Sequence, residues 1–219
     1  MQKNNHNLFF DCDGVILDSN HIKTEAFREC LKNEKKENIE LFINYHKKNQ
    51  GIDRFKKLNY FFSKIKKNFT HKNYLEALNE YSSLCAVNLK NSELVSGVKK
   101  FLENANKSNY SCYVISGSEQ NELRNVLKYK KLDKYFKGIY GSPLNKIENI
   151  NLALDHRPPK KNDIFFGDAK SDMIAAIKSN LKFIYLSECS DWMEGREICK
   201  KYSYEIYKNF DEVIKAKII

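Results

Sequence analysis

The chain has 219 residues, of which 42% are hydrophobic and 30% are charged, a composition typical of a globular protein. No apolar run approaches the roughly 18 residues of a membrane span, so we expect a protein outside the membrane. The formal net charge of +10 favours an anionic partner, but only five of the 38 basic residues are arginine, which argues against nucleic acid binding as the main function. The six cysteines form no Cys-x-x-Cys pair, which disfavours a structural zinc site. The N-terminus lacks the apolar stretch of a signal peptide, so we expect a cytoplasmic protein with reduced thiols.

The first predicted element is a buried strand over residues 7–12, which contains the start of the motif Asp11-Cys12-Asp13-Gly14. Two carboxylates therefore stand two residues apart at the carboxyl end of a strand, where open α/β sheets bind ligands. One carboxylate in this place can attack phosphorus while the other donates a proton to the leaving group. An ordinary turn is the alternative interpretation, because Asp and Gly are common in turns.

The segment after this strand contains no convincing strand and no proline, and its aromatic and aliphatic side chains recur at helical spacing. We therefore expect an all-helical cap domain at 19–92, inserted into a core that consists of 1–18 and 93–219. Within the cap, Gly51 marks a break between helices. Arg54 follows this break and is a candidate contact for an anionic substrate, with a surface arginine at a helix start as the alternative.

The remainder of the chain alternates between predicted strands and helices. The strands are short apolar or aromatic runs at 110–115, 139–140, 163–166 and 182–186. The helices lie at 94–107, 118–130, 145–155 and 170–179. Runs that are apolar throughout are typical of parallel strands covered on both faces. The sequence therefore predicts an α/β fold, with a Rossmann-like parallel sheet core and the inserted helical cap.

Two motifs in the second half of the chain follow predicted strands. Ser116 and Gly117 end one strand, and a hydroxyl beside free backbone N–H groups suits a phosphate. A plain helix N-cap at Ser118 is an equally good interpretation of this motif. Lys146 follows the shortest predicted strand and could neutralise a phosphoryl group, although most lysines of a lysine-rich chain are solvated surface charges.

Another pair of carboxylates follows the predicted strand at 163–166. Asp168 comes directly after Gly167, and Asp172 lies four residues further on, in the first turn of the next helix. Hard oxygen ligands of this kind suit Mg²⁺, which binds a few carboxylates together with water and phosphate oxygens. Asp172 could instead only complement the helix dipole.

These four motifs occur in a fixed order, each at a strand end: Asp-x-Asp-Gly, Ser-Gly, Lys and Gly-Asp-x-x-x-Asp. In this arrangement the whole chain resembles the haloacid dehalogenase-like hydrolase superfamily, and most of all its branch of phosphatases with a helical cap after the first motif. The resemblance implies that Asp11 is a nucleophile that becomes an aspartyl-phosphate and that Asp13 is the general acid and base. It also implies bound Mg²⁺, with four acidic residues at the metal: Asp11, Asp13 (through its backbone carbonyl), Asp168 and Asp172, the last either as a ligand or just behind one.

The resemblance also assigns the groups that contact the phosphate. Ser116 and the Gly117 N–H would bind the transferring phosphoryl group, and Lys146 would pair with the nucleophile and the phosphate. Two adjacent carboxylates need pKa values that are pushed apart. We expect Mg²⁺ and Lys146 to favour ionised Asp11, and Asp13 to hold a proton.

Details of the motifs narrow the choice within the superfamily. An Asp at position 13 argues against the dehalogenase members and against the phosphonate-cleaving members. Phosphomutase members typically carry a His twelve residues after the nucleophile, whereas this chain has Lys23 there, with His21 two residues short. We therefore expect a Mg²⁺-dependent phosphatase acting on a small phosphorylated metabolite. The alternatives are a phosphomutase similar to beta-phosphoglucomutase and, less favoured, a nucleic-acid-binding module.

Overall fold

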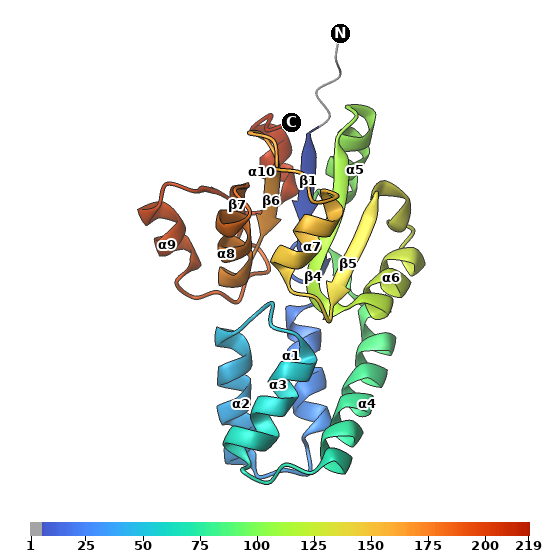
Figure 1. Ribbon diagram of the computed structural model, residues 1–219, viewed down its shortest axis with the longest axis vertical. Coiled ribbons are helices and arrows are strands. Elements are labelled where there is room, and N and C mark those ends of the chain that lie inside the picture. Colours follow the sequence, from blue (N-terminus) through green and yellow to red (C-terminus); the bar gives the residue numbers. More distant parts are fainter. Residues whose placement is uncertain (1–5) are drawn as a thin grey trace.

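The core of the protein is a six-stranded parallel sheet, as shown by a computed structural model that describes residues 6–219 (Figure 1). Its strands are β1 (Asn7–Phe10), β4 (Ser111–Glu119), β5 (Gly138–Ser142), β6 (Ile164–Gly167), β7 (Lys182–Leu186) and β8 (Glu205–Tyr207). Their order across the sheet is β5-β4-β1-β6-β7-β8, and each neighbouring pair is parallel. Because β1 is central, both of its faces are covered, and this explains its uninterrupted apolar run.

Successive side chains of a strand point to opposite faces, so the phenylalanine pairs of β1 and β6 divide between two layers. Phe10 and Phe166 stack on one face at a centroid distance of 5.2 Å, and Phe9 and Phe165 stack on the other at 6.5 Å. The first face is covered by α5 (Val98–Lys107), α6 (Gln120–Tyr129) and α10 (Phe210–Lys215), and the second by α7 (Lys146–Ala153), α8 (Lys170–Lys178) and α9 (Gly195–Lys201). Across residues 6–219, no helix combines the length and the apolar character that crossing a membrane requires.

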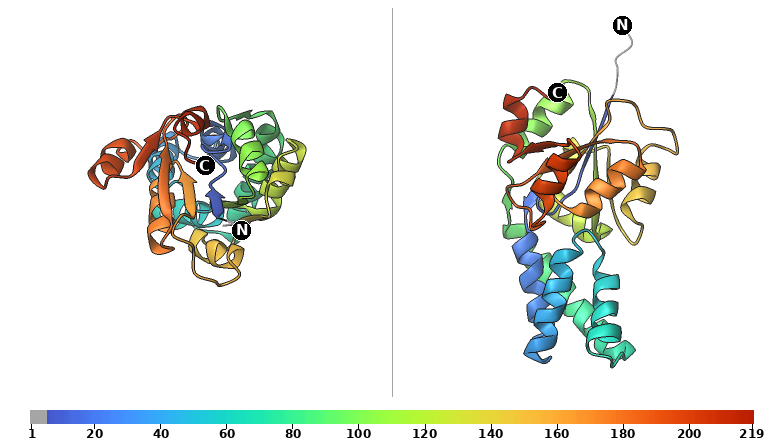
Figure 2. Two further views of the ribbon diagram at one scale, coloured as in Figure 1. Left: turned by 90° about the horizontal axis from the view of Figure 1, so that it is seen from above. Right: turned by 90° about the vertical axis from the view of Figure 1, so that its left-hand side faces the viewer.

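Between β1 and β4 the chain forms the helical cap, which lies beyond the carboxyl ends of the strands (Figures 1 and 2). It consists of α1 (Asn20–Cys30), α2 (Lys36–Lys48), α3 (Arg54–Tyr60), a π-helical turn (Phe61–Ile65), α4 (His71–Asn88) and a 3₁₀ turn (Leu89–Asn91). Phe27 of α1 packs against Phe42 and Tyr81 from two other cap helices, at centroid distances of 5.1 and 4.0 Å. The chain's exit from the core, β2 (Leu17–Asp18), pairs antiparallel with its return, β3 (Glu93–Leu94).

This architecture confirms the predicted fold class, a Rossmann-like parallel sheet with an inserted helical cap. The strand predicted at 110–115 is longer in the structure, because β4 continues through Ser118 to Glu119 with a register shift against β5. Helix α6 therefore begins at Gln120, and the Glu119 carboxylate accepts its first free N–H groups. The alternative that Ser118 is the N-cap of this helix is wrong.

The other differences from the prediction concern short elements. The sequence indicated neither the edge strand β8 nor the paired strands β2 and β3, each of which has only two or three residues. Helix α5 begins at Val98, four residues after the predicted start, because the chain first forms β3. Strands this short carry no recognisable apolar run, so only their pairing defines them.

Candidate active site

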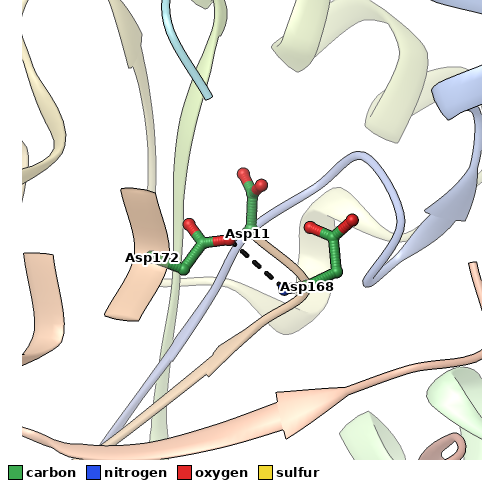
Figure 3. Close-up of side chains that lie close together, drawn as sticks. All are labelled: Asp11, Asp168 and Asp172. Carbon is green, nitrogen blue, oxygen red and sulfur yellow. Dashed lines mark hydrogen bonds between the residues drawn. The ribbon is translucent and has the colours of Figure 1, made fainter. Parts of the chain in front are cut away.

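Three carboxylates meet where neighbouring strands of the sheet end. Asp11 follows β1, Asp168 follows β6, and Asp172 lies in the first turn of α8. Each offers a carboxylate oxygen, and these oxygens all lie within 4.8 Å of one another (Figure 3). All three residues are buried. Because like charges in low dielectric repel strongly, this cluster needs positive charge beside it.

Lys146 supplies one positive charge to the cluster. Its Nζ lies 3.0 Å from Asp11 Oδ2 and also donates to Asp172 Oδ1. It stands at the first residue of α7, where a capping box between Asn145 and Glu148 fixes the start of the helix. Burial alone would lower the pKa of Lys146, but the carboxylates of Asp11 and Asp172 outweigh burial and raise it. Lys146 is therefore a cation beside Asp11.

Asp172 is held on both oxygens by donors from the protein. Its Oδ1 accepts from Lys146, and its Oδ2 accepts from the backbone N–H groups of Asp168 (3.2 Å) and Ala169 (3.0 Å). A side chain on Gly167 would overlap the Asp172 carboxyl group. This carboxylate therefore fixes the loop that carries Asp168 and orients Lys146.

Asp13, two residues after Asp11, accepts several donors. Ser19 Oγ donates to its Oδ1 at 2.6 Å, and Ser118 Oγ donates to its Oδ2 at 2.7 Å. The Nζ of Lys23 lies 2.9 Å from the same Oδ2 and also donates to Ser118. Lys23 thus reaches from the cap to a core carboxylate, a contact that the sequence did not indicate.

When only protein groups are present, the pKa values of the two carboxyl groups of the first motif are shifted in opposite directions. Burial raises the pKa of Asp11 to about 7, with Asp172 and Asp13 adding to the effect against the opposing charge of Lys146. Burial also acts on Asp13, but Lys23 and the hydroxyls of Ser19 and Ser118 lower its pKa overall. The prediction underestimated the cap, because it included no cation beside Asp13.

The donor set at the strand ends fits a hard divalent cation. Asp11 Oδ1 is buried and has no hydrogen-bond partner among the described residues. Burial and the neighbouring carboxylates of Asp172 and Asp11 raise the pKa of Asp168 well above its usual range. Carboxylate oxygens at a common point, one of them without a partner, are what Mg²⁺ prefers in a protein site.

The cap closes onto the core through two glycines. A Cβ on Gly117 would overlap the Gly51 carbonyl oxygen, and a Cβ on Gly51 would overlap Ser171 Oγ and lie 3.3 Å from Lys146 Nζ. Gly51 also has a φ of +78°, which side-chain-bearing residues rarely adopt. The break that the sequence placed at Gly51 is therefore the point where the cap backbone rests on Gly117 of β4.

Residues from both domains line one small cavity of about 50 Å³. From the core come Asp11, Asp13, Ser116, Gly117, Ser118, Asp168 and Ala169, and from the cap come Asn20, Lys23, Phe27, His46, Gln50, Gly51, Ile52, Arg54, Lys57 and Tyr81. The structure thus brings the predicted motifs and Arg54 together, with Lys146 and Asp172 beside Asp11. The Arg54 guanidinium donates to Glu122 of α6 and to Ser82 Oγ at 3.1 Å.

Sequence reasoning missed Lys57 and Glu122 in this site. Lys57 lies one helical turn after Arg54, and this spacing is the only signal that could have identified it. Glu122 belongs to the core and meets Arg54 only because the cap is closed. Contacts between domains depend on their relative placement, which no local pattern encodes.

Comparisons with known proteins agree with this geometry. The sequence profile described as "Haloacid dehalogenase-like hydrolase" matches residues 8–186. Among solved structures, a Clostridium difficile protein provisionally described as a phosphatase is 25% identical, with a TM-score of 0.73 and full coverage of both chains. A haloacid dehalogenase-like hydrolase of Streptococcus pneumoniae is 20% identical, with a TM-score of 0.71, and the match covers 96% of this chain and 98% of the other. A beta-phosphoglucomutase of Clostridium difficile is also 20% identical, with a TM-score of 0.71, and the match covers 98% of this chain and 97% of the other. No curated protein sequence matches the chain.

Proposed function

The chain belongs to the haloacid dehalogenase-like hydrolase family, and we propose that it is a Mg²⁺-dependent phosphatase that hydrolyses a small phosphorylated metabolite through an aspartyl-phosphate on Asp11. One observation carries the proposal. The buried Asp11 has one oxygen without a partner among residues 6–219 and the other 3.0 Å from Lys146, and it lines a cavity between the core and the cap. A carboxylate held in this way is suited to attack an anionic phosphate that Lys146 also attracts.

In the first step, an Asp11 oxygen forms a bond to phosphorus as the bond from phosphorus to the leaving-group oxygen breaks. The leaving-group oxygen takes a proton from Asp13, which must hold this proton against the pKa-lowering effect of Lys23, Ser19 and Ser118. Ser116, the Gly117 N–H and Lys146 would hold the phosphoryl oxygens, since the first two line the cavity and the third contacts Asp11. The closed cap excludes water from this step.

In the second step, water attacks the phosphorus and the bond to Asp11 breaks, which releases phosphate and restores the carboxylate. Asp13 takes the proton from the attacking water, so its proton count returns to the starting value. The ionised form of Asp13, favoured by Lys23, Ser19 and Ser118, is the form that this step requires.

We propose that Asp11, Asp168 and the backbone carbonyl of Asp13 hold the Mg²⁺. Asp172 would act behind them, because both of its oxygens already accept protein donors. When bound, Mg²⁺ would offset the negative charge of the carboxylates and of the phosphate.

We also propose domain boundaries at 18/19 and 92/93, where β2 pairs with β3. We further propose a cytoplasmic location, where the six free thiols would stay reduced.

The test is hydrolysis of an aryl phosphate with and without Mg²⁺, using the wild type and Asp11→Asn. The matched control is Asp155→Asn, a carboxylate that is exposed and distant from the cavity. Asp11→Asn should lose at least about 10³-fold in kcat/KM and the control nothing. Equal activity in Asp11→Asn and the wild type would overturn the mechanism. Isomerisation of a sugar phosphate that requires a bisphosphate activator, without phosphate release, would favour the phosphomutase.

A further inference from the structure

The cap wall of the cavity carries three buried cations. The exposed fractions of Lys23, Arg54 and Lys57 are 8%, 5% and 3%. Lys23 pairs with Asp13, and Arg54 pairs with Glu122, so each has a carboxylate partner within the protein. Buried charges of this kind are normally retained only when they are paired.

Lys57 differs from the other two cations. Over residues 6–219 it forms no ion pair, and its Nζ has one polar contact, His46 Nδ1 at 2.8 Å. Burial lowers the pKa of Lys57 to about 7, and the positive charge of Lys23 adds to this effect. An ammonium group has three N–H donors, and His46 accepts from only one of them. Lys57 therefore keeps donors for a group inside the cavity that it lines.

A chain of hydrogen bonds orients Lys57. Burial, together with Lys57 and Lys23, lowers the pKa of His46 well below its usual range, so the ring is neutral. Since Nδ1 accepts from Lys57, the ring proton is on Nε2 and is donated to Thr24 Oγ1 at 3.2 Å. The Thr24 hydroxyl in turn donates to the Asn20 carbonyl at 3.0 Å. Two side chains, His46 of α2 and Thr24 of α1, thus hold the amine of Lys57 at the cavity wall.

The charges also differ between the two ends of the cavity. Asp11, Asp13 and Asp168 line the core side of the cavity, whereas no carboxylate among the described residues lines its cap side. Glu122 lies beside the cap cations, where it accepts from Arg54 and is 3.5 Å from Lys23. A negative group in the cavity would therefore meet Lys57 as a cation that has no ion pair among residues 6–219. The cavity of about 50 Å³ admits only a short leaving group.

We propose that Lys57 binds a carboxylate on the leaving group, so that the substrate is a phosphate ester of a short hydroxy acid. This inference rests on the proposed phosphatase function. One free cation matches a singly charged carboxylate better than a second phosphate, which carries close to two charges and three strong acceptor oxygens. The carboxylate would take the hydrogen bonds that Lys57 does not give to His46.

The test compares two phosphate esters of the same length, 2-phosphoglycolate and 2-hydroxyethyl phosphate, which differ by a carboxylate in place of a CH₂OH group. The variant is Lys57→Met, and the matched control is Lys56→Met on the exposed side of the same helix. We expect the wild type and Lys56→Met to prefer 2-phosphoglycolate by at least about 30-fold in kcat/KM. In Lys57→Met, the ratio of kcat/KM for the two esters should fall at least about tenfold below the wild-type ratio. In Lys57→Arg, the ratio should lie between those of the wild type and Lys57→Met.

Two results would overturn the inference. One is a preference ratio in Lys57→Met equal to that of the wild type, with folding of the variant checked by its thermal transition. The other is a stronger, Lys57-dependent preference for 1,2-ethanediol bisphosphate, which would assign the site to a second phosphate. Hydrolysis of an aryl phosphate by the wild type separates this inference from the proposed function, because its absence would mean that the phosphatase assignment itself had failed.

Discussion

The two walls of the active-site cavity are built in different ways. The core wall carries acidic residues at the ends of strands, where backbone geometry and glycines fix each position, as at Asp11 and Gly117. The cap wall carries basic residues on helices, and their positions depend on contacts between side chains, as at Lys57 and His46. The contrast suggests a division of labour in which the core performs the reaction and the cap selects the leaving group.

The largest expected effect falls on the core wall, at Lys146. Lys146→Met leaves Asp11 and Asp172 without their shared cation, so phosphoryl transfer should slow by about 10³-fold in kcat. Measured kcat under saturating substrate and Mg²⁺ checks this expectation. A loss below about tenfold would show that Lys146 is not part of the reaction wall.

The next effect tests the contact between the walls. Gly117→Ala places a methyl group where the Gly51 carbonyl oxygen lies, so the cap cannot seat fully and kcat/KM should fall about 10²-fold. Gly138→Ala is the matched control, since its new methyl meets only the movable Tyr140 side chain. If both variants kept wild-type activity, closure at Gly51 would not matter for turnover.

A third effect separates function from stability on the cap wall. An unpaired buried amine disfavours folding, so Lys57→Met should raise the free energy of unfolding by about 2–4 kcal/mol at pH 7. Between about pH 7 and the ordinary lysine pKa of 10.5, the unfolded chain binds a proton that the folded chain does not. In the wild type this group makes stability rise with pH across that window, and the variant lacks this contribution. Urea unfolding of both proteins at pH 7, 8 and 9 tests the sign, and a gap that fails to narrow as pH rises contradicts it.

The smallest effect concerns a charge pair outside the cavity. Arg28 and Glu40 pair on the exposed surface of the cap, where water screens the interaction. Glu40→Gln should therefore leave kcat/KM within about twofold and the melting temperature within about 2 °C of the wild type. A larger loss of activity would mean that the outer face of the cap also controls the cavity.

The sequence predicted the core wall well because each of its groups is a local feature. A strand end followed by Asp or Gly is recognisable without knowledge of the rest of the fold, and Asp11, Asp13, Ser116, Lys146 and Asp168 all gather as expected. The pKa of Asp13 could not be predicted in the same way, because it depends on Lys23, which comes from the cap.

The cap wall could be predicted only in part, since helical spacing identifies helices but not how they meet the core. Arg54 was singled out through the glycine before it, whereas its partner Glu122 lies 68 residues away in sequence. The role proposed for Lys57 could not be predicted, because only the packing of α1, α2 and α3 shows that it has no ion pair within residues 6–219.

The pairing of β2 with β3 has a consequence for how such proteins diversify. It places the residues just before the insertion, Leu17 and Asp18, opposite the residues just after it, Glu93 and Leu94. An insertion of different sequence could connect β2 to β3 if its two ends lay equally close together. The six-stranded sheet would then keep its strand order. The cap could therefore be replaced by another insertion without a change in the sheet that carries Asp11 and Asp168.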